Sequence, residues 1–225
     1  MEDISSRTRL LLGQGADRLN AASVAVFGLG GVGSYCAEAL ARAGIGRILL
    51  CDGDAVAPSN LNRQLCALRS TLGRNKAEVV AARVRDIRPE TGLTVMTGFI
   101  RPETDFSFLA GYDYAADCID DVPAKLALIC ACRDLGVPIL SAMGCGNRLD
   151  PTAFRVTDVY RTSGCPLARS VRGKLRKLGV ESLNVVFSEE KPLHPASAVP
   201  GSVSFVPGAA GLVMAGKIVR DLCGL

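Results

Sequence analysis

A glycine pattern between an apolar segment and a helix-forming segment is the first feature of this sequence that could do chemistry. Gly28, Gly30 and Gly33 match Gly-x-Gly-x-x-Gly, and Gly31 lies inside the pattern. Such glycines let the backbone approach a phosphate, whose charge is favoured by the N-terminus of the following helix. Asp52 follows at the roughly 20-residue spacing where a carboxylate can accept hydrogen bonds from a ribose. The pattern predicts a nucleotide site, and by itself it suits NAD as well as ATP.

Cations and amides that follow Asp52 separate these two nucleotides. Asn60, Arg63 and Gln64 lie in the run Ser-Asn-Leu-Asn-Arg-Gln, and Lys76 follows in the first turn of a predicted helix. Adenylation by ATP must neutralise a triphosphate and a pentacovalent α-phosphorus. A dehydrogenase has no evident use for an arginine and a lysine at these places. Either cation alone could be an ordinary surface residue, but the two in this order favour ATP.

Three aspartates gather near the end of a predicted strand. They are Asp117, Asp120 and Asp121, and Pro123 then begins a helix. Side-chain oxygens at a helix start accept hydrogen bonds from the first backbone N–H groups. On the residues alone, we interpret Asp120 and Asp121 as helix-start residues.

The elements that must position these groups alternate between strands and helices. Apolar runs predict strands over residues 23–27, 47–51, 93–97, 112–119, 138–142, 154–159 and 184–187. Helices are predicted over residues 31–43, 76–87, 123–135 and 209–222, with a further basic helix within residues 165–180. Strand, helix, strand at this spacing implies parallel strands joined by right-handed crossovers. We therefore predict an α/β fold, Rossmann-like and doubly wound, with a mostly parallel sheet and an elaborated C-terminal part.

The composition fits one globular domain. The 225-residue chain is 48% hydrophobic and 21% charged, which argues against a disordered or fibrous protein. We expect a single domain over residues 1–225, with a nucleotide-binding core at 7–145 and a substrate-binding elaboration at 146–225. The N-terminus lacks the profile of a signal peptide, and no apolar run approaches the ~18 residues of a membrane span. The expectation is a cytoplasmic protein without a membrane partner.

The cysteines and the single histidine limit the other chemistries. The nine cysteines form no Cys-x-x-Cys pair and His194 is the only histidine, which argues against zinc sites. We expect His194 in a solvated Pro-rich loop and the cysteines mostly reduced and structural. Cys165 is not expected to be a catalytic nucleophile.

A basic segment stands out against a net charge of only +4. Residues 165–180 contain five cations and no acidic residue: Arg169, Arg172, Lys174, Arg176 and Lys177. Helical spacing would place the apolar stripe Leu167, Val171, Leu175 and Leu178 inward and the cations outward. An outward basic face is either simply solvated or a contact for phosphate oxygens.

These motifs together resemble the ThiF/MoeB superfamily of adenylating enzymes, which includes ubiquitin-activating enzymes. The resemblance covers residues 7 to about 145 and rests on the glycine loop, Asp-Gly-Asp, Ser-Asn-Leu-Asn-Arg-Gln and Lys76. It implies that Asp52 binds ribose, that Asp120 holds Mg²⁺, and that Arg9 enters the ATP site of a second subunit in a homodimer. It also implies the triphosphate-binding set Asn60, Arg63, Gln64 and Lys76.

The second half of the chain indicates a branch of that superfamily. Residues 155–167, the basic helix and residues 185–190 resemble the tRNA threonylcarbamoyladenosine dehydratases. This resemblance implies adenylation of a carboxylate on tRNA and its cyclisation with net loss of water, with the basic helix on the tRNA backbone. The alternatives are adenylation of a small carrier protein, a NAD-binding oxidoreductase, and a regulatory nucleotide-binding module. A sulfur-transfer protein is kept as a candidate partner.

Overall fold

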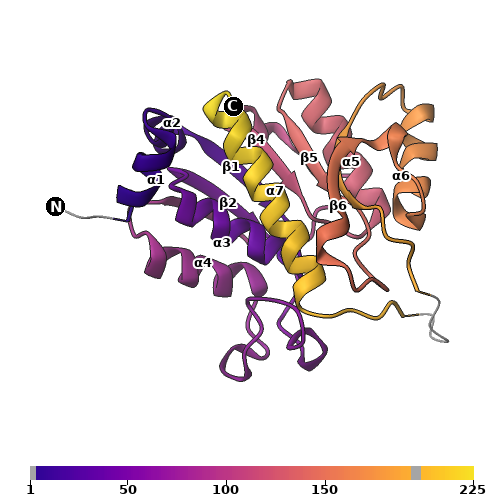
Figure 1. Cartoon of the computed structure of the whole chain (residues 1–225), viewed down its shortest axis with the longest axis horizontal. Helices are drawn as coiled ribbons and strands as arrows, with labels where there is room; N and C mark the ends of the chain where they lie inside the picture. The colour runs from indigo at the N-terminus through magenta and orange to yellow at the C-terminus, as the bar shows by residue number, and fades with distance from the viewer. Residues whose placement is uncertain (1–3, 194–198) are drawn as a thin grey trace.

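A seven-stranded sheet forms the centre of the molecule (Figure 1). The structure is a computed structural model that describes residues 4–193 and 199–225. The strands are β1 (Ser23–Phe27), β2 (Arg47–Cys51), β3 (Gly92–Met96), β4 (Tyr114–Asp117), β5 (Ile139–Ala142), β6 (Phe154–Asp158) and β7 (Asn184–Ser188). Their order is β3-β2-β1-β4-β5-β7-β6, and every adjacent pair is parallel except β6 with β7. The predicted α/β fold with a mostly parallel sheet is confirmed.

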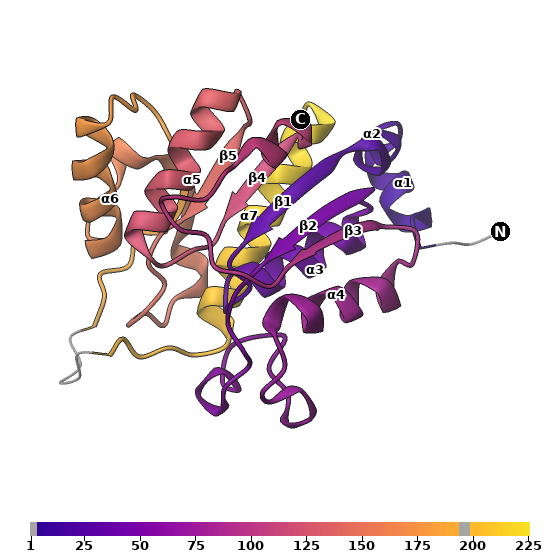
Figure 2. The same cartoon turned by 180° about the vertical axis from the view of Figure 1, so that it is seen from behind.

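Helices cover both faces of the sheet (Figures 1 and 2). They are α1 (Ser6–Leu12), α2 (Gly15–Ala21), α3 (Gly33–Ala43), α4 (Lys76–Ile87), α5 (Val122–Leu135), α6 (Pro166–Lys177) and α7 (Phe205–Cys223). Helices α3, α4 and α7 share one buried apolar cluster, while α5 and α6 cover the opposite face. Along β1, Val24 and Val26 face the first layer and Ala25 and Phe27 face the second, as the two-residue period of a strand requires.

Most predicted elements are present, with differences at their ends. β1, β2 and α4 have the predicted bounds, while α3 begins at Gly33 because Gly31 and Val32 belong to the preceding turn. Helix α7 begins at Phe205, four residues earlier than predicted, with Pro207 in its first turn. Proline is tolerated there because the first N–H groups of a helix have no partner within it. Helices α1 and α2 were not predicted.

The basic helix has the predicted apolar stripe with one exception. Val171 and Leu175 are fully buried, and Ala168 joins them. Leu178, expected in the stripe, is 46% exposed because α6 ends at Lys177 and Leu178 leaves the helical register. The expectation for Leu178 was therefore wrong.

Two further expectations concern the cysteines and the membrane. All nine cysteines are free. Within residues 4–193 and 199–225, no helix combines the length and the apolar character needed to cross a membrane. His194 lies outside the described residues.

Candidate nucleotide-binding site

A cavity of about 760 Å³ opens at the carboxyl ends of the parallel strands. The strand order reverses beside β1, and nucleotides bind at such a reversal in open α/β sheets. Nine residues predicted from the sequence line this cavity: Gly28, Gly30, Gly31, Asp52, Asn60, Arg63, Gln64, Lys76 and Asp120. The tertiary structure thus brings the predicted nucleotide residues to one place.

The glycine loop after β1 leaves no room for side chains at two positions. Gly28 has φ +82°, and a Cβ there would lie 2.8 Å from the carbonyl oxygen of Cys118. At Gly33, a Cβ would lie 1.7 Å from the carbonyl oxygen of Gly28. The turn therefore needs glycine at both ends, and it directs the N-terminus of α3 toward the cavity.

The Asp52 carboxylate is fixed by backbone N–H groups from two loops. Leu29 N–H donates to Oδ2 at 2.6 Å, and Asp54 N–H donates to Oδ1 at 2.8 Å. An ionised carboxylate has about four acceptor positions, so each oxygen keeps one for a ribose hydroxyl. The first bond also ties the end of β2 to the glycine loop.

Lys76 is a buried cation at the start of α4. Asn75 caps this helix by accepting hydrogen bonds from Ala77 and Glu78, which fixes the turn that carries the lysine. Lys76 is 5% exposed, and its Nζ lies 2.7 Å from Oδ2 of Asp54. An ammonium group has three donors, so Nζ keeps two for an anion in the cavity.

Arg63 is held by one of its three guanidinium nitrogens. Its Nη1 donates to the carbonyl of Ser59 at 2.8 Å and to Oδ1 of Asn62 at 2.9 Å. Within the described part of the chain, Nε and Nη2 have no partner. These two nitrogens present the side of the guanidinium fork that matches phosphate geometry.

Asn60 and Gln64 are both 8% exposed and line the same wall as Arg63. Oδ1 of Asn60 accepts a hydrogen bond from Ala57 N–H at 3.0 Å, which shapes the turn before Arg63. Nε2 of Gln64 would lie 3.6 Å from a Cβ placed on Gly30. Asn60 therefore shapes the loop as well as lining the cavity, and Gln64 faces the glycine loop.

The three aspartates after β4 differ in what they contact. Asp117 is fully buried, and its Oδ2 lies 2.7 Å from Nζ of Lys125, so it does not face the cavity. Asp121 caps α5 by accepting from Ala124 N–H at 2.9 Å. Asp120 lines the cavity, is exposed, and has no hydrogen-bond or ion-pair partner among the described residues. The interpretation as a helix-start residue therefore holds for Asp121 and not for Asp120.

The surroundings of Asp120 can be compared with the ligands that Mg²⁺ requires. Among the described residues, no group of three histidine, cysteine, aspartate or glutamate side chains could hold a metal ion. Mg²⁺ usually keeps several waters and is bound by one or two carboxylates together with substrate phosphates. One free carboxylate beside a phosphate site fits that pattern.

Both ends of the cavity contain residues that sequence reasoning missed. At one end the ring of Phe99 packs on Gly53, where a Cβ would lie 2.6 Å from the ring. At the other end the lining comprises Gly144, Cys145, Gly146, Leu167 and residues 199–202. The position of Phe99 just after β3 was a usable signal, because carboxyl ends of parallel strands meet at this edge. No local pattern marks residues 199–202.

The thiols in the cavity wall are poor nucleophiles at neutral pH. Burial, with a smaller effect of Asp52, raises the pKa of Cys51 to about 12, and burial raises the pKa of Cys145 to about 12. A hydrogen bond with Cys36, followed by burial, raises the pKa of Cys118. Cys165 is 4% exposed, and its Sγ accepts from the backbone N–H of Ala168 as the cap of α6. The reactive thiolate form is therefore disfavoured at the three cavity-lining thiols.

Arg9 lies outside the cavity of its own chain. It is part of α1, where Nε donates to Oγ of Ser5 at 3.0 Å and Nη1 lies 2.7 Å from Oδ1 of Asp17. Its side chain is 49% exposed. Any contribution of Arg9 to a nucleotide site requires another subunit.

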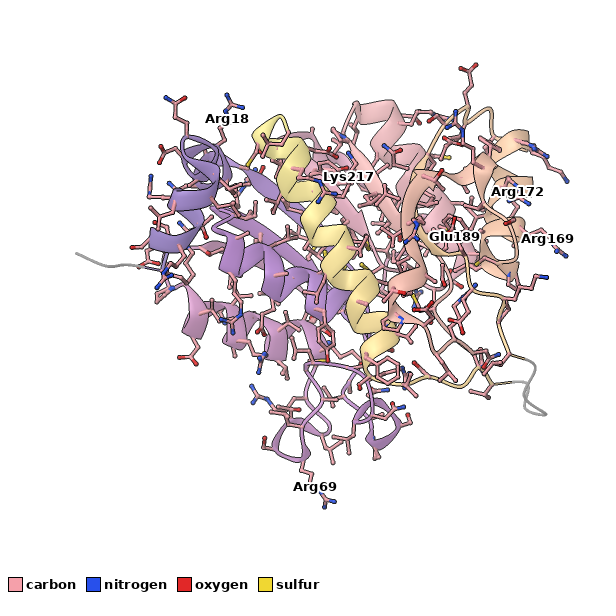
Figure 3. The ribbon with its side chains drawn as sticks, in the orientation of Figure 1. Arg18, Arg69, Arg169, Arg172, Glu189 and Lys217 are labelled. Atoms are coloured by element: carbon pink, nitrogen blue, oxygen red, sulfur yellow. The ribbon has the colours of Figure 1, made fainter. Side chains whose placement is uncertain are left out.

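The basic helix α6 adjoins the cavity through Leu167 in its first turn. Arg169, Lys174 and Lys177 are exposed, and Figure 3 shows Arg169 pointing away from the protein. Arg172 differs from the outward expectation, because its Nη1 donates to the carbonyl and to Oγ1 of Thr162, both at 2.8 Å.

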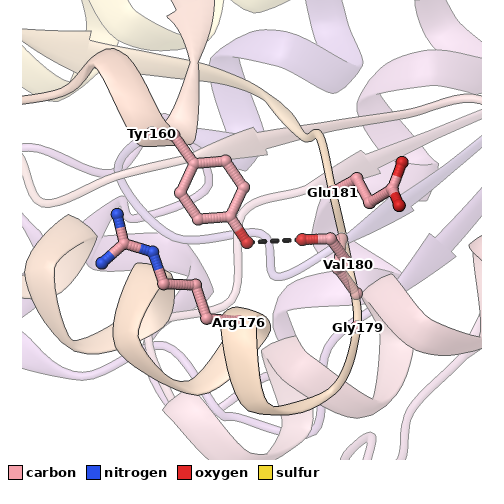
Figure 4. Close-up of a pocket in the computed structure, with 5 residues that line it drawn as sticks. All are labelled: Tyr160, Arg176, Gly179, Val180 and Glu181. Atoms are coloured by element: carbon pink, nitrogen blue, oxygen red, sulfur yellow. Dashed lines mark hydrogen bonds between the residues drawn. The ribbon is translucent and has the colours of Figure 1, made fainter.

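Arg176 lies over the ring of Tyr160 with 5.3 Å between the guanidinium carbon and the ring centroid. The hydroxyl of Tyr160 donates to the carbonyl of Val180, and Figure 4 shows this arrangement. Together with Gly179 and Glu181 these residues line a surface hollow of about 420 Å³. Arg176 is therefore partly committed to a contact within the protein.

A family model matches nearly the whole chain, with residues 5–225 aligned to the ThiF family. The chain belongs to the ThiF family. It is 41% identical to a Bacillus subtilis (strain 168) tRNA threonylcarbamoyladenosine dehydratase over 96% of this chain and 93% of that protein. It superposes with a TM-score of 0.92 on a crystal structure of E. coli tRNA N6-threonylcarbamoyladenosine dehydratase, TcdA, in complex with ATP. That match has 37% sequence identity and covers 97% of this chain and 93% of the E. coli chain.

A relative that is an adenylyltransferase and sulfurtransferase rather than a dehydratase is matched over less of its own length. The Mus musculus adenylyltransferase and sulfurtransferase MOCS3 is 31% identical over 94% of this chain and 42% of the mouse protein. The predicted resemblance to the ThiF superfamily and its dehydratase branch is confirmed. The predicted enzyme class, an ATP-dependent adenylating enzyme, agrees with these relatives.

Proposed function

We propose that this ThiF-family chain catalyses the ATP-dependent cyclising dehydration of threonylcarbamoyladenosine in tRNA. The observation that carries the proposal is the continuity of one cavity. Its phosphate-type end holds Asp52, Arg63 and Lys76, and its other end reaches the first turn of the basic helix α6. The extensive similarity to dehydratase relatives supplies the substrate.

The first chemical step is the activation of a carboxylate. The carboxylate oxygen of the threonylcarbamoyl group attacks the α-phosphorus of ATP, and the bond to the β-phosphate oxygen breaks. The products are an acyl adenylate and pyrophosphate. Nε and Nη2 of Arg63 and the ammonium of Lys76 offset the negative charge that develops on the phosphates.

The second step closes a ring. A nitrogen or oxygen of the carbamoyl group on the same nucleoside attacks the activated carbonyl, AMP leaves with the original carboxylate oxygen, and the carbamoyl N–H proton is released to solvent. The modified base has then lost the elements of one water. An intramolecular nucleophile has a high effective molarity, so this step needs no cysteine. The raised pKa of Cys145 is consistent with this route.

Several parts of the site complete the proposal. The Gly28 turn would bind phosphate, Asp52 the ribose, and the ring of Phe99 on Gly53 would border the base. Asp120 would hold Mg²⁺, which shields phosphate charge when bound. The outward cations of α6 would contact the tRNA backbone, which positions the tRNA without reading its sequence.

We further propose a homodimer in which Arg9 acts in the neighbouring subunit's site, and a cytoplasmic location. The basis for the first is that Arg9 is exposed and remote from its own cavity. The basis for the second is the tRNA substrate. A sulfur-transfer protein stays a candidate partner. The single-domain organisation, with its boundary near residue 145, also stays a proposal.

The second candidate function is adenylation of the C-terminus of a small carrier protein, favoured by the similarity to the mouse MOCS3 protein. One experiment separates the candidates: incubation with ATP, Mg²⁺ and tRNA bearing threonylcarbamoyladenosine, followed by nucleoside mass spectrometry. We expect the nucleoside to lose the mass of one water with stoichiometric AMP release. An unchanged nucleoside would favour the carrier protein. Tight NAD(H) binding without ATP-dependent AMP release would contradict adenylation altogether.

A further inference from the structure

Residues 199–202, here called the strap, lie along the cavity and belong to a part of the chain distant from the nucleotide residues. Ser202 accepts a hydrogen bond at its carbonyl from Nδ2 of Asn62 at 2.9 Å, a contact between residues 140 positions apart. At the other side of the cavity, Asn147 holds the strap through Gly201. The strap is therefore attached at two points by two asparagines.

The attachment at Asn147 is built for close contact. Gly201 N–H donates to Oδ1 of Asn147 at 2.6 Å, and Asn147 N–H donates to the carbonyl of Gly201 at 2.8 Å. Asn147 has φ 60° and is the one non-glycine residue with positive φ in the described part of the chain. A Cβ on Gly146 would lie 2.7 Å from Cβ of Pro200, so the strap passes directly over this loop. A strained backbone kept at a site edge indicates a positional requirement.

The anchor at Asn147 is itself rigid. The next residue, Arg148, is 3% exposed and donates to the carbonyls of Gly144 and Gly146. Its Nε also donates to the carbonyl of Glu190 at 3.1 Å. These bonds fix the loop after β5, so the strap is tied to the sheet at this end.

The attachment at Asn62 also involves Arg63. Oδ1 of Asn62 accepts from Nη1 of Arg63 at 2.9 Å, while its Nδ2 donates to the carbonyl of Ser202. A single amide thus joins the strap to the arginine that lines the cavity. Both hydrogen bonds need the same orientation of this exposed side chain, so fixing the strap also fixes the anchored nitrogen of Arg63.

From these contacts we infer that Asn62 and Asn147 are positioning residues that hold Arg63 for attack at the α-phosphorus through the strap. The inference rests on the proposed adenylation and assigns no contact with substrate to either asparagine. Losing a restraint on a long side chain misplaces its donors, and small misplacements lower rates strongly. The remote residue Asn147 should therefore affect the chemistry at Arg63.

The test uses Asn147→Gly, which tolerates the positive φ but removes the acceptor for Gly201, and Asn147→Asp, which keeps both. Hydrogen–deuterium exchange is followed at the amides of Arg63 and Gln64, which are bonded to the carbonyl of Asn60 at 3.1 Å and 3.0 Å. The glycine variant should exchange these amides about five- to tenfold faster, the effect of one ordinary hydrogen bond. The aspartate variant should match the wild type.

Kinetics give the second readout. Asn147→Gly should lower kcat for AMP formation about five- to tenfold and leave KM for ATP within about twofold, because it acts on positioning rather than on ground-state binding. The double variant Asn62→Ala with Asn147→Gly should be no slower than the slower single variant, because both break one connection. Wild-type exchange at Arg63 and wild-type kcat in Asn147→Gly would overturn the inference, as would multiplying losses in the double variant. Failure of the proposed function is distinguishable, because the wild type would then form no AMP while the exchange measurement still decides the connection.

Discussion

At the scale of single residues, the site is a set of charged groups whose partners leave part of each group free. One guanidinium nitrogen of Arg63 is bonded to Ser59 and Asn62, and the other two have no partner among the described residues. The ammonium group of Lys76 is paired with Asp54 and has two further N–H donors. Because the anchors come from the protein, these cations are oriented before the nucleotide binds, and preorganised charge is the form that stabilises a transition state best.

Replacing Arg63 tests the arginine directly. Arg63→Ala should lower kcat for AMP formation by about 10²-fold or more, the usual effect of removing one positioned charge from a transition state. The matched control is Arg69→Ala, which removes an exposed arginine of the same loop region that does not line the cavity and points outward in Figure 3. Quenched-flow measurement of AMP with saturating tRNA gives the rates. Equal rates for the two variants would refute the role of Arg63.

The cavity thiols should be dispensable. Because burial raises the pKa of Cys145 to about 12, its thiolate is disfavoured at pH 7.5 to 8, and iodoacetamide should modify it slowly. Cys145→Ala should keep kcat within about twofold, because no covalent step through sulfur is needed. Intact-protein mass spectrometry under turnover checks the same point. A substrate adduct on this cysteine would show the ring-closing step to be wrong.

At the scale of elements, helix α6 and the end of β6 lead to predictions about tRNA binding and about stability. Helix α6 buries Val171 and Leu175, which turns its cations outward beside the end of the cavity marked by Leu167. The junction between β6 and the following turn is held by one carboxylate, Asp158.

The outward lysines of α6 should bind tRNA through charge alone. Lys174→Ala with Lys177→Ala should raise KM for tRNA several-fold, leave KM for ATP unchanged, and reduce the dependence of binding on salt by about one ion per removed contact. Arg85→Ala is the matched control, because Arg85 is exposed on α4 across the sheet. Filter binding of tRNA at several salt concentrations measures the slopes. If Arg85→Ala weakens tRNA binding equally, the cations of α6 do not form the tRNA-binding surface.

Asp158 should make stability depend on acid pH. Burial alone would raise its pKa, but hydrogen bonds from Tyr160, Ser182 and Leu183 lower it more, so the net shift is downward from 3.8. A lowered pKa means that the ionised group stabilises the fold above about pH 3.8 and that this is lost as pH falls through the folded pKa. Asp158→Asn should therefore cost about 1–2 kcal/mol of unfolding free energy at pH 7.

Urea unfolding of wild type and Asp158→Asn from pH 7 downward measures that difference. The difference should shrink as pH falls below about 3.8 and vanish below the lowered pKa of Asp158 in the folded protein, where the wild-type carboxyl is also protonated. A difference that stays constant with pH would mean that packing rather than charge is responsible. Asp86→Asn is the matched control, because Asp86 is exposed and its carboxylate accepts no hydrogen bond from the described residues.

At the scale of the whole molecule, the site joins distant parts of the chain, and the proposed dimer would add another. The cavity takes residues from the glycine loop after β1, from the loop with Arg63 and from the strap. Arg9 lies on α1, away from this cavity. If Arg9 completes the site of a neighbour, one molecule alone lacks a cation that the reaction uses.

Mixing two inactive variants tests this arrangement. In a heterodimer of Arg9→Ala and Arg63→Ala, one site has both defects and the other has none if Arg9 acts across a two-fold interface. Random mixing of equal amounts should then restore about a quarter of wild-type AMP formation, because half of the dimers are mixed and half of their sites are intact. Native mass spectrometry with one variant labelled with ¹⁵N confirms that mixed dimers form, because the labelled, mixed and unlabelled dimers then differ in mass. Activity no higher than that of the separate variants would place Arg9 outside the partner's site.

The sequence alone determined the features that depend on residues close together in the chain, namely the bounds of several elements and the glycine turn. The bounds of β1, β2 and α4 follow from local periodicity and capping, and the glycine turn follows from sterics within a few residues. The parallel sheet follows from the order of elements, and its carboxyl edge predicts where Asp52 and Arg63 meet. Lys76 and Asp120 could be named for the same reason, with the family resemblance assigning their roles.

Tertiary structure decided what depends on contacts far apart in the chain. Asp117 is paired with Lys125, whereas Asp120 lines the cavity without a partner among the described residues, although both aspartates lie in one short segment. The tertiary structure turned Arg172 inward to Thr162, because the neighbouring turn offered two acceptors. It also placed the strap against Asn62 across 140 positions. No local pattern specifies such a contact, because its energy arises only when the packed sheet brings both segments to one edge.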